Sequence, residues 1–142
     1  MPELDMNLAS GISAFEAKEF AKALKFLSPI AETGDAQAQY RLAIMYQNGL
    51  GVVRNDMMAF KWMRAAADHG YALAQHGLGF MYLQGECAMK NEKEAAKWFQ
   101  LAAEQGLAGS QMTLGMLYEQ GVGVEKNEAE AKKWYDKAAQ TS

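Results

Sequence analysis

The sequence predicts an all-α protein, an α/α solenoid built from about four helix-turn-helix repeats. Two observations lead to this prediction. The first is that a tryptophan and a glycine recur every 36 residues without insertion or deletion, as Trp62, Trp98, Trp134 and as Gly49, Gly85, Gly121. The second is that the apolar residues between them follow helical spacing, so we expect no strand. A fixed period of this length is typical of stacked repeat proteins.

Length and composition suit one domain. The 142 residues match the size of an ordinary domain, and half of them are hydrophobic, which is enough for a continuous core. We expect a single repeat domain over residues 1–142. It would consist of a divergent unit at 4–34 and three regular units at 35–70, 71–106 and 107–142.

Charge and cysteine content narrow the functional classes. The net charge is −3, acids and bases are intermixed, and no strongly basic segment points to nucleic acid. No apolar stretch approaches the length of a membrane span. Cys87 is the sole cysteine, so no internal disulfide can form. The start lacks the basic and apolar regions of a signal peptide, which slightly favours the cytoplasm, whereas a processed form would fit the periplasm.

The first unit contains two predicted helices joined by a short link at residues 16–19. Leu8, Ile12 and Phe15 have helical spacing, and a second apolar series runs from Phe20 to Ile30. The second helix keeps the 36-residue register of the later units. We therefore interpret the first helix and its turn as compressed.

Each regular unit begins with a predicted helix, at Ala36–Asn48, Ala72–Gln84 and Ala108–Gln120. A glycine follows each helix, and glycine adopts the left-handed conformation of a helix end at least cost. The second helices are expected to end near Asp68, Glu104 and Gln140. The chain therefore has eight predicted helices, two in each of four units.

A recurring asparagine marks the start of each second helix, at Asn55, Asn91 and Asn127. Asparagine suits an N-cap because its side-chain oxygen accepts a backbone N–H of the first turn. Asn91 and Asn127 are each followed three residues later by glutamate. This spacing predicts a reciprocal capping box in which the glutamate also accepts from the asparagine N–H.

The repeated positions predict how the helices pack. The small residues Ala43, Gly79 and Gly115 would let the first helix of a unit approach the second closely. The recurring tryptophans are expected in the core. Replacing one of them by alanine should cost about 3–5 kcal/mol.

The repeated segments are similar to those of the Sel-one-like repeat (SLR) family, relatives of the tetratricopeptide repeats. The resemblance covers residues 35–140 and rests on AQAQYRLAIMYQNGLGV, AFKWMRAAADHG and their copies, such as LGFMY, LGMLY, GVGV, AAKWF, AAEQG and AKKWY. The loop at 85–89 departs from the pattern because Cys87 replaces a glycine, so we expect a different turn there. The resemblance implies a right-handed superhelix of antiparallel helix pairs, with the first helices lining its concave side.

The resemblance also implies where a partner would bind. The concave positions are Gln37, Tyr40, Ile44, Gln47, Asn48, Leu73, His76, Phe80, Leu83, Gln84, Gly109, Met112, Met116, Glu119 and Gln120. These positions differ between units while the core positions repeat, as expected if one set stacks and the other meets a partner. The alternative is that Ile44, Phe80 and Met116 are partly core.

The candidate surface is mainly apolar, and Arg41 is the only obvious cation beside it. A groove that clamps a carboxylate or phosphate needs converging basic side chains. We therefore expect an apolar or amphipathic peptide or helix as partner. The methionines would make the surface adaptable.

No catalytic or metal site is expected, and no cofactor. The sequence lacks a P-loop, GxSxG, HExxH and a Rossmann fingerprint. His69 and His76 have no cysteine or carboxylate at ligand spacing, and Cys87 has no nearby base.

The leading hypothesis is a non-catalytic adaptor that binds proteins on its concave face. One alternative is recognition of a small molecule or cell-wall fragment as the accessory module of an envelope enzyme. Another is a self-association unit. The chain would be a monomer if its last face is polar enough, or a weak homodimer through the uncapped C-terminal repeat. Lys132, Lys133, Asp136 and Lys137 favour the polar last face.

Overall fold

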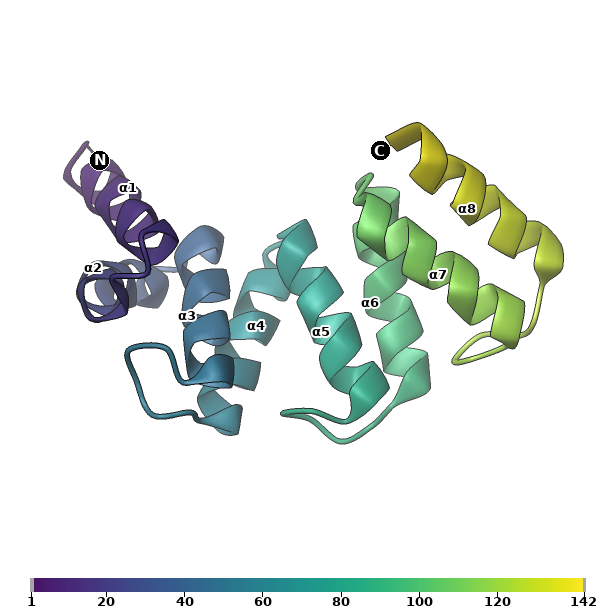
Figure 1. Ribbon diagram of the computed structural model, residues 1–142, viewed down its shortest axis with the longest axis horizontal. Coiled ribbons are helices and arrows are strands. Elements are labelled where there is room, and N and C mark those ends of the chain that lie inside the picture. Colours follow the sequence, from purple (N-terminus) through teal and green to yellow (C-terminus); the bar gives the residue numbers. More distant parts are fainter. Residues whose placement is uncertain (1, 142) are drawn as a thin grey trace. The chain divides into compact units, whose positions relative to one another are not determined.

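The computed structural model describes residues 2–141, and the side chains of residues 6–141. Over this range it contains eight α-helices and no strand, as the sequence predicts. The helices are α1 (Pro2–Glu16), α2 (Phe20–Glu32), α3 (Ala36–Asn48), α4 (Asp56–Asp68), α5 (Ala72–Gln84), α6 (Glu92–Glu104), α7 (Ala108–Gln120) and α8 (Glu128–Thr141) (Figure 1). The fold is a helical repeat of the α/α solenoid class.

The helices form two compact units, residues 1–69 with α1 to α4 and residues 70–142 with α5 to α8. Within each unit, consecutive helices pack against one another. Each predicted repeat supplies one helix pair, whose first member we call the A helix and whose second member we call the B helix. The single domain, the right-handed twist and the concave face remain predictions.

The predicted helix ends are confirmed where a glycine follows the helix and where an asparagine precedes it. Gly49, Gly85 and Gly121 follow the A helices with φ of 67°, 70° and 70°. This left-handed conformation allows the backbone N–H to bond back to the helix, as from Gly49 to Met45. Both the stop of each A helix and its length therefore follow from the local sequence.

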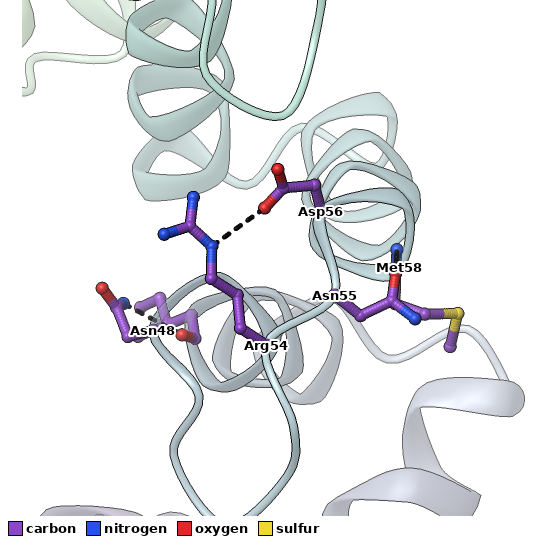
Figure 2. Close-up of polar contacts among 6 residues, drawn as sticks. Asn48, Arg54, Asn55, Asp56 and Met58 are labelled. Atoms are coloured by element: carbon purple, nitrogen blue, oxygen red, sulfur yellow. Dashed lines mark hydrogen bonds and ion pairs between the residues drawn. The ribbon is translucent and has the colours of Figure 1, made fainter.

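The asparagine N-caps are also present. Asn55 Oδ1 accepts from the backbone N–H of Met58 at 3.1 Å at the start of α4, and Arg54 Nε lies 3.1 Å from Asp56 Oδ1 beside it (Figure 2). At the equivalent caps, the backbone N–H groups of Glu94 and Glu130 donate to the asparagine Oδ1 atoms at 3.1 and 3.0 Å. One free N–H group at the start of each of α4, α6 and α8 is thus bonded by the preceding asparagine.

The reciprocal half of the predicted capping box is wrong. The backbone N–H of Asn91 donates to the carbonyl of Tyr82 at 2.9 Å, and that of Asn127 donates to Tyr118 at 2.9 Å. The carbonyl comes from the A helix of the same repeat, so it replaces the glutamate as acceptor. This bond ties the loop back onto the A helix.

In the three regular repeats, each loop between the A and B helices has a left-handed residue at its third position. Gly51 and Gly123 adopt φ of 72°, and Cys87 adopts 64°. The different turn that we expected at Cys87 is therefore wrong, because the cysteine keeps the left-handed conformation of the glycines. A Cβ on Gly123 would overlap the carbonyl of Glu92, and one on Gly51 would lie 2.7 Å from Phe20 Cβ. These two loops therefore pack against the first residue of the preceding B helix, Phe20 of α2 and Glu92 of α6.

The core follows the predicted repeat. Trp62, Trp98 and Trp134 are only 3–5% exposed, so their assignment to the core is confirmed. Gly79 lies against Phe99, where an added Cβ would be 2.9 Å from the ring. Small residues on the A helices therefore do allow close approach of the B helices, as Gly115 does for the ring of Tyr135.

Candidate partner-binding surface

In the unit of residues 1–69, α3 carries the first group of candidate residues. Gln37 and Asn48 are exposed, while Tyr40 and Ile44 are half-buried. Asn48 Nδ2 donates to the carbonyl of Ile44 at 3.0 Å, which is one of the contacts drawn in Figure 2. The α3 face is therefore a mixed surface with polar residues at both ends.

In the unit of residues 70–142, α5 and α7 carry the other candidate residues. Leu73, Met112 and Met116 are 42%, 51% and 41% exposed, although all three are large and apolar. Gln84 and Gln120 at the ends of the two helices are exposed as well. In Figure 1, α5 and α7 both lie on the near side of α6. We call the face formed by Leu73, His76, Phe80, Met112 and Met116 the α5–α7 surface.

His76 links the two helices of this surface. Its Nδ1 lies 2.7 Å from Oγ of Ser110 on α7. Its ring packs edge-on against Phe80 and Phe99, with centroids 5.0 and 5.4 Å apart. Burial lowers the pKa of His76, so its imidazole is neutral at neutral pH. Phe80 is itself 4.9 Å from the buried Phe99, so His76 and Phe80 both lie partly in the core and partly at the surface.

Comparison with known proteins identifies the repeat. The sequence pattern of the Sel1 repeat matches residues 36–71, 72–107 and 108–140, which is most of the chain. The chain belongs to the Sel1 repeat family. Sel1 repeats are generally protein-interaction modules, and their proteins typically are non-catalytic scaffolds. A comparison with curated proteins found no significant match.

Solved Sel1 repeat structures resemble this one closely. A Sel1 repeat protein from Oxalobacter formigenes is 37% identical with a TM-score of 0.91, covering 95% of this chain and 56% of that one. The protective antigen c5321 of uropathogenic Escherichia coli is 35% identical with a TM-score of 0.92, covering 98% of this chain and 31% of that one. This chain therefore spans about half and about a third of those two proteins.

A more distant structure shares the fold alone. The cysteine rich protein B of Helicobacter pylori is 22% identical with a TM-score of 0.69, covering 87% of this chain and 89% of that one. Its name indicates several cysteines, whereas this Sel1 repeat chain has only Cys87.

Sequence reasoning missed a set of buried glutamines that hold successive Sel1 repeats together. Gln39 and Gln111 are each 4% exposed. Their Nε2 groups donate to the carbonyls of Ala31 and Ala103 at 3.1 Å. These carbonyls belong to the last turn of the preceding B helix, where they also accept the N–H of Gly34 and of Gly106 at 3.0 Å. The signal was visible, because glutamine recurs at position 75 with the same 36-residue period.

Charged side chains near the A helices have local roles. The Arg41 guanidinium lies 5.8 Å from the ring of Phe15, and its Nη1 donates to the Gln37 carbonyl at 3.2 Å. The lysines beside the tryptophans of the B helices place Nζ over the indole rings, at 4.6 Å for Lys61 and 5.3 Å for Lys97. These contacts are cation–π pairs on the outside of the core.

The outer face of α8 is polar. Lys132 pairs with Asp136 at 3.0 Å on this face. On the side of α8 that faces α7, the Tyr135 hydroxyl donates to Glu119 Oε1 at 3.4 Å. Burial and the nearby Glu119 carboxylate raise the pKa of Tyr135, so the hydroxyl keeps its proton. This polarity agrees with the expectation from the lysines of this helix, and the weak homodimer stays a prediction.

Among the described residues, no group of three or more His, Cys, Asp or Glu side chains could hold a metal ion. In the same part of the chain, no helix is long and apolar enough to cross a membrane.

Proposed function

We propose that this Sel1 repeat chain is an adaptor that holds an apolar or amphipathic segment of a partner protein on the exposed faces of its A helices. The observation that carries the proposal is the exposure of Leu73, Met112 and Met116 on the α5–α7 surface. Exposed apolar side chains that adjoin one another on a surface mark interaction sites. Single exposed residues would need no explanation.

The composition of the α5–α7 surface supports a peptide or helix as ligand. Met112 and Met116 lie on successive turns of α7, so they cover a strip along the helix. Methionine side chains adapt their shape and suit partners whose apolar residues vary. None of the five residues that define the surface carries an ionised group, so the partner segment should be apolar where it meets them.

The test is affinity capture from a lysate of the native host, with the unchanged chain and two variants as baits. The first bait carries Met112→Lys and Met116→Lys, which place charges on the α5–α7 surface. The control bait carries Met89→Lys, because Met89 is 90% exposed in a loop outside that surface. Circular dichroism should show that both variants fold as the unchanged chain does.

We expect a protein that the unchanged chain and the Met89→Lys control retain, and that the double variant loses. A protein retained equally by all three would place the binding site elsewhere on the molecule. If no protein is retained by the unchanged chain, the adaptor proposal is wrong.

A further inference from the structure

His76 is the polar group at the centre of an otherwise apolar surface. Leu73 lies one helical turn before it on α5, and Phe80 lies one turn after it. The equivalent positions of the other regular repeats hold Tyr40 and Met112. A histidine here is therefore not required by the stacking of the repeats.

The contact with Ser110 favours one tautomer of His76, the one that satisfies both groups. Ser110 is 0% exposed, so its hydroxyl proton needs a protein acceptor. The described contact of that hydroxyl is His76 Nδ1, at 2.7 Å. When the hydroxyl donates to Nδ1, both groups are satisfied. The neutral ring then carries its own proton on Nε2.

The Nε2 edge of the ring faces Gly109. A Cβ added to Gly109 would lie 3.5 Å from His76 Cε1 and 3.9 Å from Nε2, in ordinary contact. Because glycine lacks that atom, this edge of the ring is not covered by a side chain at position 109. The half-buried ring can thus present an N–H donor on the α5–α7 surface.

We propose that His76 is the specificity-determining residue of the α5–α7 surface, and that its Nε2–H donates to an uncharged carbonyl of an apolar partner segment. The inference rests on the proposed function, because it names the chemistry that this surface selects. The carbonyl can belong to the peptide backbone or to an amide side chain.

Charge complementarity favours an uncharged ligand over an ionic one. The described ring, hydrogen-bond and glycine contacts of His76 are with Phe80 on α5, Phe99 on α6, and Gly109 and Ser110 on α7. None of these four groups can ionise, so they offer no charge that would pair with a carboxylate or an ammonium group of a ligand. A charged ligand would lose its water without compensation.

An uncharged and an ionic ligand predict opposite responses to pH. An uncharged segment buries the ring further and lowers the His76 pKa more, so its affinity should fall when acid protonates the free surface. A carboxylate would stabilise the imidazolium and raise the His76 pKa, so its affinity should rise on acidification. The direction of the change therefore decides between the two classes.

The experiment uses the full chain and three matched probes in NMR titrations. N-acetyl-leucinamide is neutral, N-acetyl-leucine is anionic, and leucinamide is cationic. The methyl signals of Met112 and Met116 report binding, and imidazole nitrogen correlations report the tautomer of His76. His76→Phe serves as the variant that keeps an aromatic ring and removes the donor.

We expect an Nε2–H tautomer without ligand and the tightest binding for the neutral probe. His76→Phe should lower the affinity for the neutral probe by about fivefold, which is the effect of one neutral hydrogen bond. An Nδ1–H tautomer overturns the inference, as does tighter binding of the anionic probe that strengthens in acid. Equal binding of all probes with no effect of His76→Phe would refute the role of His76 and leave the apolar surface standing. No change at either methionine methyl would refute the surface itself.

Discussion

A single buried acceptor allows a sharp test of how these repeats are held together. Gln39 is 4% exposed, and its Oε1 has no hydrogen-bond partner among the described residues. In the next two repeats the same oxygen is satisfied. Gln75 Oε1 accepts from Gln105 Nε2 at 2.8 Å, and Gln111 Oε1 accepts from Thr141 Oγ1 at 3.0 Å.

The missing donor corresponds to His69, which occupies the place of Gln105 one period earlier. The His69 ring instead lies against its own helix, with Nδ1 2.9 Å from the Ala65 carbonyl. Replacing His69 by glutamine should supply the amide N–H that Gln105 supplies in the next repeat. A satisfied buried acceptor avoids a desolvation cost of about 1–3 kcal/mol, and part of this gain is lost in ordering the new side chain.

We therefore expect His69→Gln to raise the free energy of unfolding of residues 1–69 by about 1 kcal/mol. Denaturant unfolding, with hydrogen exchange of α3 and α4 to localise the effect, measures this change. His69→Ala is the control, because it removes the ring without adding a donor and should give no gain. The gain should also vanish when Gln39 is leucine, as a double-mutant cycle requires. A neutral or destabilising His69→Gln, or a gain that persists without Gln39, would refute the reasoning.

Four further substitutions test the loops and caps by denaturant unfolding. Gly123→Ala should lower the free energy of unfolding by more than about 2 kcal/mol, because the new Cβ adds left-handed strain and also overlaps the preceding B helix. Gly106→Ala is the control, because Gly106 has a φ of 93° and no atom lies within 4 Å of an added Cβ. It should cost only the strain, about 1 kcal/mol. Equal costs for these two would contradict the docking of the loop. Cys87→Gly should stabilise by about 1 kcal/mol by relieving left-handed strain, and a loss would show that the thiol contributes more than the strain costs. Asn91→Ala should cost about 1 kcal/mol through the lost N-cap, and no loss would mean that water replaces the cap.

Features that depend on neighbouring residues in the chain were predictable from the sequence. In the three regular repeats the A helices have the predicted bounds, and a glycine that adopts the left-handed conformation ends each one. The asparagine caps were predictable for the same reason. The reciprocal capping box was not, because the Tyr82 carbonyl that replaces Glu94 as acceptor reaches Asn91 only after the loop has folded back.

Features that depend on packing between helices could not be predicted. Ile44 and Met116 occupy equivalent positions, yet Ile44 is half-buried and Met116 is 41% exposed. The difference depends on which side chains of adjacent helices cover them. Gln39 was missed because glutamine is usually exposed, and its burial depends on the bond from its Nε2 to the Ala31 carbonyl of the preceding helix.

Variation between repeats is not sufficient to identify a binding surface. The leucines at 42, 78 and 114 repeat because they are 0–1% exposed, so each copy meets the same core. Loop positions vary as well, since Val53 and Met89 correspond to a glutamate in the last repeat and are 89% and 90% exposed. What distinguishes the α5–α7 surface is continuity. Met112 and Met116 share one helix face, and His76 is bonded across to α7. A partner segment can contact these side chains together, and this continuity makes the surface a stronger candidate than the isolated apolar residues of the loops.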